Sequence, residues 1–389
     1  MTLPARALVL GLARSGQAAS AALARRGVDV VGADRSLGND RDPGLLDGVE
    51  VLVKSPGVPG EHELVVAARG RGIEIWSEVE LGYRLLPGGS LVGVTGTNGK
   101  TTTVELLGAI FREAGRDVAV AGNVGRPLSG IEPAEWVICE LSSFQLEDVH
   151  ELTCRIAILL NLEPDHLDRH GTFDDYTAAK LRIFERAAEK IVPRGSGLDG
   201  IAFSVDDPLP AEPLMPGRHN RENAAAATAA ARLTGIDDDA TARALRTFPG
   251  VRHRLELVAE VRGVRYVNDS KATNVTAARR ALEAYADAPV HLIAGGRGKG
   301  ESFRQLAEAA APNVRTVYAL GQTAAEIAAA FGKRAVEVPD LAAAVARAAA
   351  GARAGDVVLL SPACASYDQY ENFEERGEEF RRLVQNLTS

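Results

Sequence analysis

The chain has 389 residues, more than one typical domain, so two or three domains are expected. Its 46% hydrophobic and 25% charged residues are typical of a globular protein and argue against a disordered one. The net charge of −8 argues against a general nucleic-acid-binding or membrane-binding surface. A phosphate ligand would therefore need a local positive site.

The apolar run Leu8–Ala13 is too short for a signal sequence or a membrane span. The three cysteines, Cys139, Cys154 and Cys364, are widely separated and lack C-x-x-C spacing, which indicates reduced, structural thiols. We therefore expect a cytoplasmic protein.

Residues 1–88 alternate short apolar runs with helix-like segments, which predicts a small doubly wound, Rossmann-like domain. The expected strands are Ala7–Leu12, Val28–Gly32, Val51–Val53 and Glu74–Trp76. The turn Gly11–Gly16 resembles a dinucleotide-binding motif, and Asp34 ends the second strand as a ribose-binding acid would. Because Ala13 replaces the second glycine of that motif, we favour another nucleotide over a dehydrogenase cofactor.

The turn Lys54–Pro59 follows the third expected strand, at the end of the sheet where α/β proteins bind ligands. Its Ser55 could contact a ligand, or the whole segment could be a rigid structural turn. The sequence leaves both interpretations open.

The stretch Leu91–Thr103 predicts a strand, a phosphate-binding loop and the first turn of a helix. Backbone N–H groups of such a loop face a phosphate, Lys100 adds positive charge, and the hydroxyl of Thr101 is the expected Mg²⁺ ligand. The strict P-loop pattern requires glycine at position 94, where this chain has Val94. An ordinary glycine turn capped by threonine is the alternative.

Three further strands are expected in this region: Val118–Ala121, Trp136–Leu141 and Arg155–Leu162. Asn123 follows the first and could face a ligand or cap a turn. Glu140 ends the second, where a Mg²⁺-directed carboxylate would lie beside a P-loop. The acid-rich and histidine-rich segment 161–170 follows the third, and it could bind a metal or substrate or form a solvated loop.

A helix is predicted from Phe173 to Ile191, with Lys180 near the centre of its apolar face. A lysine in that position points inward, and a buried ammonium must be paired or lose its proton. A neutral amine could react with CO₂ to form a carbamate, but a simple buried ion pair is equally compatible with the sequence.

Residues 193–217 are expected to form loops around one strand, Ile201–Val205, and the chain is expected to change domain near Pro249-Gly250. A second doubly wound sheet follows, with strands Arg265–Asn268, Val290–Ala294, Thr316–Leu320 and Val357–Leu360. Small polar residues follow every one of these strands. They include Lys271 and Lys299, which suit an anionic ligand.

The motifs GTNGKTT, GNVG, ELSSFQLE, EPDHLDRHGTFDDYTAAKLRIFE, HNREN, VRHRLE, NDSKATN, GGRGKG and SPACASYDQYENFEERG occur in one order along the chain. Together they resemble the Mur ligase family from end to end. Within it, NDSKATN, SPACASYDQYENFEERG, GLARSG and KSPGVP resemble the members that add D-glutamate. The segment between Lys180 and His219 is short for the family.

The resemblance implies an α/β fold with three domains. They are a Rossmann-like UDP-binding domain over 1–88, a P-loop ATP-binding domain over 89–249 and a Rossmann-like domain over 250–389 that binds the incoming amino acid. It also implies that ATP phosphorylates the carboxylate of UDP-N-acetylmuramoyl-L-alanine and that D-glutamate attacks the acyl phosphate. The product is a peptidoglycan precursor, and the enzyme is expected to be a monomer.

The family's functional residues are carried over by motif. Catalysis is assigned to Lys100, Glu140, His166 and Lys180, with one Mg²⁺ at Thr101 and Glu140 and a second at His166 and a CO₂-derived carbamate on Lys180. ATP is assigned to Gly96, Thr97, Asn98, Gly99, Lys100, Thr101, Thr102, Asn220, Asn223, Arg254 and Asp269. The UDP-sugar substrate is assigned to Ser15, Asp34, Arg35, Ser55, Asn123 and Ser142, and D-glutamate to Lys271, Thr273, Lys299, Ser366 and Phe373.

Two alternatives stay open. Another amino-acid-adding ligase of the family, including folylpolyglutamate synthase, shares the central loop. A nucleotide-gated binding protein would use the P-loop as a switch, although such a switch does not need an inward-pointing lysine on the following helix.

Overall fold

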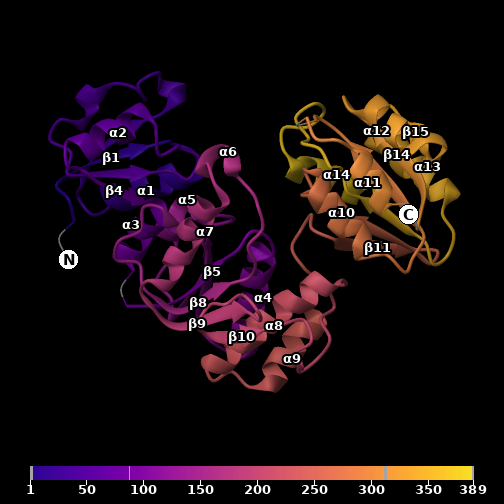
Figure 1. Ribbon diagram of the computed structural model, residues 1–389, viewed down its shortest axis with the longest axis horizontal. Helices are drawn as coiled ribbons and strands as arrows, with labels where there is room; N and C mark the ends of the chain where they lie inside the picture. Colours follow the sequence, from indigo (N-terminus) through magenta and orange to yellow (C-terminus); the bar gives the residue numbers. More distant parts are fainter. Residues whose placement is uncertain (1–2, 87, 299, 311–312, 388–389) are drawn as a thin grey trace. The chain divides into compact units, whose positions relative to one another are not determined.

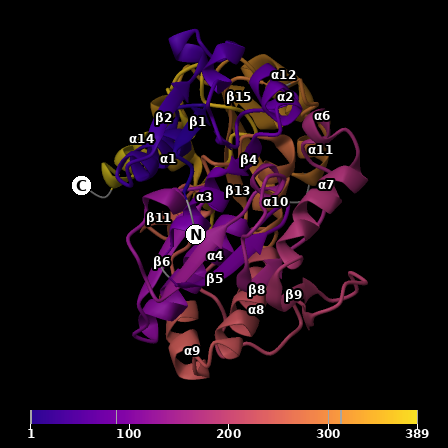
Figure 2. The same cartoon turned by 90° about the vertical axis from the view of Figure 1, so that its left-hand side faces the viewer.

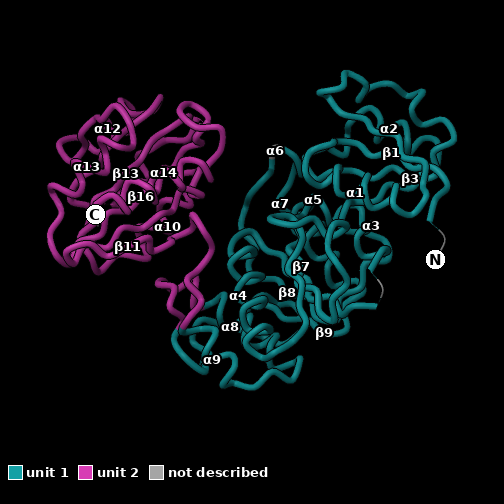
Figure 3. The backbone as a smooth tube through the Cα atoms, turned by 180° about the vertical axis from the view of Figure 1, so that it is seen from behind, with its two compact units in different colours: residues 1–212, 222–246 teal, residues 213–221, 247–389 magenta. Residues whose placement is uncertain are grey.

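The computed structural model describes residues 3–86, 88–298, 300–310 and 313–387 (Figure 1). The chain packs as two compact units, the first made of residues 1–212 and 222–246 and the second of residues 213–221 and 247–389 (Figure 3). Three sheets, two in the first unit and one in the second, fall within the three predicted domain ranges. The α/β fold class is confirmed, whereas the domain boundaries stay a prediction.

The N-terminal sheet of the first unit has the strand order β2-β1-β3-β4, and all its strands are parallel. They are β1 (Arg6–Leu10), β2 (Asp29–Ala33), β3 (Val51–Lys54) and β4 (Glu74–Ser77), joined by α1 (Arg14–Ala24), α2 (Glu63–Gly70) and the 3₁₀ turns η1 (Arg35–Leu37) and η2 (Pro43–Leu46). Alternate residues of β1 enter two separate cores: Leu8 packs with Leu64 of α2, and Val9 packs with Leu23 of α1. The sheet is therefore covered on both faces, as predicted.

The central sheet has the order β10-β9-β8-β5-β7-β6 and is also entirely parallel. Its strands are β5 (Ser90–Thr95), β6 (Val118–Gly122), β7 (Trp136–Glu140), β8 (Cys154–Leu159), β9 (Ala187–Pro193) and β10 (Ile201–Phe203). The helices of this region are α3 (Glu78–Leu85), α4 (Lys100–Glu113), α5 (Ser143–Leu146), α6 (Leu167–His170), α7 (Phe173–Leu181), α8 (Arg218–Leu233) and α9 (Asp238–Thr247), with 3₁₀ turns η3 (Leu128–Gly130) and η4 (Arg182–Phe184) (Figures 1 and 2). Because the strands are parallel, the segments after β5, β6, β7 and β8 meet at one edge of the sheet.

The predicted helix Phe173–Ile191 is wrong in its second half. Helix α7 ends at Leu181, a 3₁₀ turn covers Arg182–Phe184, and residues 187–193 form β9 beside β8. Ala187 and Ile191 are four residues apart, a spacing that places two side chains on one face of either a helix or a strand. Pairing with β8 decides between the two. The expected strand Ile201–Val205 is likewise shorter, ending at Phe203.

The sheet of the second unit has the order β11-β12-β16-β13-β14-β15, with β11 antiparallel to β12 and the other pairs parallel. Its elements are β11 (Glu256–Val261), β12 (Val264–Asn268), α10 (Val275–Glu283), β13 (Val290–Gly295), α11 (Arg304–Ala309), β14 (Val314–Leu320), α12 (Ala324–Phe331), η5 (Gly332–Arg334), β15 (Ala335–Glu337), α13 (Leu341–Gly351), β16 (Val357–Leu360) and α14 (Phe373–Gln385). The edge strands β11 and β15 were not predicted, because partly exposed edge strands lack a continuous apolar run.

Cys139, Cys154 and Cys364 are all buried and unbonded, in agreement with the expected reduced thiols. Within the part of the chain that the structure describes, no helix combines the length and apolar character needed to cross a membrane.

Candidate active site

The phosphate-binding loop connects β5 to α4, and its backbone requires glycine. Gly96 and Gly99 have φ of 150° and 84°, in the region that side chains disfavour. A Cβ at Gly99 would lie 2.3 Å from Oδ1 of Asn223 on α8, so this glycine lets the asparagine reach the start of α4. Gly99, the residue before α4, has no side chain to cap the helix, and the N-terminus of a helix is a favourable position for an anion.

The end of β8 holds this loop in shape. Asn98 N–H donates to Oδ1 of Asn161 at 2.8 Å, and Nδ2 of Asn161 donates to Asn98 O at 3.1 Å. Thr97 exchanges two hydrogen bonds with the backbone of Glu163 and accepts one from the hydroxyl of Tyr176 at 3.0 Å. Sequence reasoning missed these bracing roles, although Asn161 and Glu163 lie in the polar segment it selected.

Two lysines meet at one carbonyl of the loop. Nζ of Lys100 donates to Gly96 O at 2.8 Å and to Thr97 O at 2.9 Å, and Nζ of Lys180 donates to Gly96 O at 2.9 Å. Lys180 is buried, as its position on the helix predicts, with 2% of its surface exposed. Burial, and next the nearby Lys100, lowers the pKa of Lys180 to about 7.

Glu140 ends β7 at the same edge and is buried. Its Oε1 accepts a hydrogen bond from Nδ2 of Asn123 at 3.2 Å, whereas Oε2 has no hydrogen-bond partner among the described residues. The hydroxyl of Thr102, in the first turn of α4, is likewise buried without one. An unpaired buried carboxylate oxygen beside a phosphate loop fits an oxygen-loving cation, and Thr101 in the same turn can supply a hydroxyl ligand. The residues present therefore fit Mg²⁺ at this position.

His166 does not form a metal-binding cluster with other side chains of the described residues. It adopts φ of 51°, its side chain is half exposed, and its Nε2 lies 3.6 Å from Oδ2 of Asp165. Across residues 3–86, 88–298, 300–310 and 313–387, no group of three His, Cys, Asp or Glu side chains is placed to hold a metal. The second metal position predicted at His166 and Lys180 stays a prediction.

The residues assigned to the UDP-sugar largely bind their own loops. Asp34 accepts hydrogen bonds from Leu12 N–H and from the N–H and hydroxyl of Ser36; these bonds, the Ser36 hydroxyl first, lower the pKa of its carboxyl to about 2. The hydroxyl of Ser55 donates to Gly11 O at 2.7 Å. Ser142 caps α5 through a capping box with Gln145, and Ser15 and Arg35 lie in the first turns of α1 and η1.

Several residues that were predicted to bind ATP or D-glutamate lie in the second unit. Asp269 is buried between Leu255 N–H at 3.2 Å and the hydroxyl of Ser361 at 2.8 Å, and burial raises the pKa of its carboxyl to about 7 although Arg254 is near. Nζ of Lys271 lies 5.9 Å from the ring centre of Phe373. Three more predicted residues lie in the loops and helix ends of this unit: Asn220, Thr273 and the buried Ser366. Nδ2 of Asn220 donates to Pro216 O. Asn223 belongs to the first unit. Lys299 lies outside the described residues.

Sequence reasoning also missed Arg376, which is buried on α14 with 1% of its surface exposed. Its guanidinium donates to Ser270 Oγ and Ser270 O, both at 2.9 Å, and to Cys364 O at 3.1 Å. It therefore joins the NDSKATN and SPAC motifs. Arg376 lies three residues after the predicted site residue Phe373, so the sequence could have placed both on one face of the helix.

Two profiles match this chain: the Mur ligase middle domain over residues 94–194 and the Mur ligase glutamate ligase domain over residues 253–364. The UDP-N-acetylmuramoylalanine--D-glutamate ligase of Anaeromyxobacter dehalogenans is 42% identical, with 97% of both chains covered. The chain belongs to the Mur ligase family. The enzyme of the same name from Caldanaerobacter subterraneus is 40% identical to this Mur ligase over 98% of both chains. The resemblance inferred from the motifs is thereby confirmed.

Solved structures share the fold of this Mur ligase. The UDP-N-acetylmuramate-alanine ligase MurC of Thermotoga maritima superposes with a TM-score of 0.64 at 18% identity, covering 98% of this chain and 99% of that one. MurF ligase from the same organism gives 0.60 at 19% identity, covering 88% and 90%. The alignment with the Anaeromyxobacter enzyme spans 449 residues, 60 more than this Mur ligase contains, so at least that many positions have no counterpart here.

Proposed function

We propose that this Mur ligase uses ATP to join D-glutamate to UDP-N-acetylmuramoyl-L-alanine, the reaction for which its relatives are named. The observation that carries the proposal is the meeting of Lys100, Lys180 and the unpaired oxygen of Glu140 at one edge of the central sheet. That arrangement offers positive charge for phosphate groups and a carboxylate for a cation. The proposed reaction is the one predicted from the sequence motifs.

The chemistry explains why such a site is needed. A carboxylate is a poor acyl donor because it is an anion without a good leaving group. Phosphorylation by ATP gives an acyl phosphate, which the amine of D-glutamate attacks as phosphate leaves. The charge on the transferred phosphoryl group must be stabilised throughout, and Lys100 and the uncapped N-terminus of α4 provide fixed positive charge for it.

Thr101 and Glu140 would hold a Mg²⁺ ion, which supplies further neutralisation of the phosphate charge when bound. The other residues at this edge position the loop: Asn161 and Glu163 fix its backbone, and Asn123 orients the carboxylate of Glu140. Two structures of similar fold were solved with ADP, a MurF ligase and Escherichia coli FolC, which supports ATP as the nucleotide.

We further propose that Lys180 carries a carbamate. Its amine is buried next to Lys100, which favours the neutral form that reacts with CO₂, and the resulting carboxylate would supply a negative ligand that an ammonium lacks. Replacement of Lys180 by alanine should abolish ligation, and added short carboxylates should restore part of it. Full activity of the variant without such rescue would exclude the carbamate.

The decisive assay measures phosphate release with UDP-N-acetylmuramoyl-L-alanine and ATP in the presence of D-glutamate, L-glutamate, D-aspartate or diaminopimelate. We expect phosphate release with D-glutamate and with none of the other three amino acids. Release with diaminopimelate instead would identify another amino-acid-adding Mur ligase. Binding of ATP and the UDP-sugar without phosphate release for any amino acid would support the nucleotide-gated binding protein. The cytoplasmic location and monomeric state stay predictions.

A further inference from the structure

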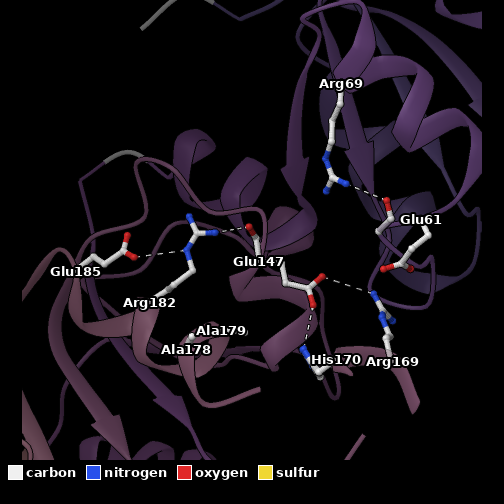
Figure 4. A pocket seen from close by; sticks show the side chains of 10 residues that line it. Glu61, Arg69, Glu147, Arg169, His170, Ala178, Ala179, Arg182 and Glu185 are labelled. Atoms are coloured by element: carbon white, nitrogen blue, oxygen red, sulfur yellow. Dashed lines mark hydrogen bonds and ion pairs between the residues drawn. The ribbon is translucent and has the colours of Figure 1, made fainter. Parts of the chain in front are cut away.

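In the first unit, a cavity of about 540 Å³ lies between the N-terminal and central sheets (Figure 4). Glu61, Arg69, Glu147, Arg169, His170 and Arg182 are among the residues that line it. Arg169 reaches from α6 across to the loop Ser55–Pro59, where one terminal nitrogen donates to Pro56 O at 2.7 Å and the other to Val58 O at 2.9 Å. One side chain thus binds two backbone carbonyls of a loop more than a hundred residues earlier in the chain.

The guanidinium of Arg169 is held on its other sides as well. Its central carbon lies 3.7 Å from the ring centre of Phe144, and its terminal nitrogen lies 4.0 Å from Oε2 of Glu147. The side chain is only 16% exposed. A planar group fixed by stacking and by two divergent N–H donors defines a geometry that a lysine ammonium would not reproduce.

The loop that Arg169 holds is connected to the turn Gly11–Gly16 of the N-terminal sheet, where the sequence predicts nucleotide binding. The hydroxyl of Ser55 donates to Gly11 O, and the neighbouring Leu12 N–H donates to Asp34. A hydrogen bond of Ser55 therefore joins this turn to the loop whose carbonyls Arg169 binds.

At its other end Arg169 is connected to His166. Its backbone N–H donates to His166 O at 3.0 Å. The ring of Phe144, on which its guanidinium stacks, meets the ring of His166 edge to face with centres 5.0 Å apart. Phe144 therefore contacts both the guanidinium of Arg169 and the imidazole of His166.

A separate contact already joins the two sheets. Lys54 at the end of β3 is fully buried, with Nζ 2.7 Å from Oδ2 of Asp148 and 3.4 Å from Oε2 of Glu147. Glu147 also pairs with His170 and Arg169 (Figure 4). This ion pair gives Lys54 a structural role, whereas contact of Ser55 with a ligand stays a prediction. It also means that loss of Arg169 should leave the sheets together and change only the loop and α6.

We propose that Arg169 is a positioning residue that couples nucleotide binding at the N-terminal turn to the placement of His166. The inference rests on the proposed function and on the predicted binding of the substrate's uridine diphosphate at that turn, with the reaction at the central sheet. Binding energy from this remote part of the substrate is then used to order the reacting centre, so truncating the substrate lowers kcat as well as raising KM.

The kinetic test combines two enzymes with two substrates: the wild type and Arg169→Met, each with UDP-N-acetylmuramoyl-L-alanine and with N-acetylmuramoyl-L-alanine 1-phosphate, which lacks the uridine and one of the two phosphates. Truncation should lower kcat of the wild type by about tenfold or more. Arg169→Met should show a similar loss with the full substrate, and truncation should then cost the variant no more than about twofold in kcat. Arg169→Lys should behave like Arg169→Met and provides a milder variant if the methionine protein folds poorly.

Arg182→Met is the matched control, because Arg182 also donates to two carbonyls beside this cavity, those of Glu147 and Val149, without touching the loop Ser55–Pro59. The loss of kcat caused by Arg182→Met should be the same with the full and the truncated substrate, so that the two effects multiply. If the effects of Arg169→Met and truncation also multiply, or if Arg169→Met changes only KM for the UDP-sugar, the coupling is refuted.

A second readout does not require turnover. In protein with ¹³C-labelled histidine, UDP alone should shift the imidazole resonance of His166, assigned by comparison with His166→Gln. The shift should persist in Arg182→Met and vanish in Arg169→Met and Arg169→Lys. No shift in the wild type, or an unchanged shift in both Arg169 variants, would overturn the inference. A wild type that shows the shift but no ligation would instead count against the proposed function.

Discussion

Replacement of Lys180 by methionine should stabilise the fold at neutral pH while abolishing ligation. The amine is buried, and burial lowers its pKa from 10.5 to about 7, so the unfolded chain binds the proton more tightly than the folded one. At pH 7 this difference costs the folded state about 4 kcal/mol relative to a neutral group. Methionine fills a similar volume without charge, and it forfeits one hydrogen bond to Gly96 O that is worth about 1 kcal/mol. The net gain expected is about 3 kcal/mol.

The pH dependence gives the sharper test. For a base whose pKa is lowered on folding, stability rises with pH between the folded and unfolded pKa values, here from about 7 to 10.5. The cost of Lys180 therefore falls to about 2 kcal/mol at pH 9, so the advantage of Lys180→Met should shrink by about 2 kcal/mol between pH 7 and pH 9.

The measurement is urea unfolding of wild type and variant in CO₂-free buffer at both pH values. Lys190→Met is the control, because it removes a lysine that is only partly buried, on β9. A Lys180→Met protein that is less stable than the wild type at pH 7, or a stability difference that is the same at pH 7 and pH 9, would refute the argument.

Three further predictions concern single side chains. Gly99→Ala places a Cβ 2.3 Å from Oδ1 of Asn223 at a φ of 84°, so KM for ATP should rise by about tenfold or more. An unchanged KM in an ATP titration would contradict the close approach. Lys54→Met removes the partner of the buried Asp148 at 2.7 Å and leaves it the more distant Arg69, 3.7 Å away, so the free energy of unfolding should fall by about 3 kcal/mol. A loss below about 1 kcal/mol in urea unfolding would show that the pair is not desolvated. Lys271→Ala should raise KM for D-glutamate more than KM for ATP, and equal effects on both in steady-state kinetics would remove its assignment to the amino acid.

Much of this protein follows from its sequence alone. Apolar runs located thirteen of the sixteen strands found in the described residues, and parallel pairing then required the segments after β5, β6, β7 and β8 to share an edge. The burial of Lys180 followed from helical periodicity even though the helix ends ten residues earlier than predicted, because Tyr176, Ile183 and Phe184 lie close enough to define the buried face.

Tertiary structure decided the contacts made to backbone atoms and those made across the sheets. Asn161 and Glu163 brace the P-loop because β8 lies next to β5, an adjacency that no local pattern encodes. Arg169 binds the carbonyls of Pro56 and Val58, and carbonyl groups are present at every residue, so their positions leave no mark in the sequence. Periodicity determines which side chains turn inward, but their partners depend on which strands become neighbours.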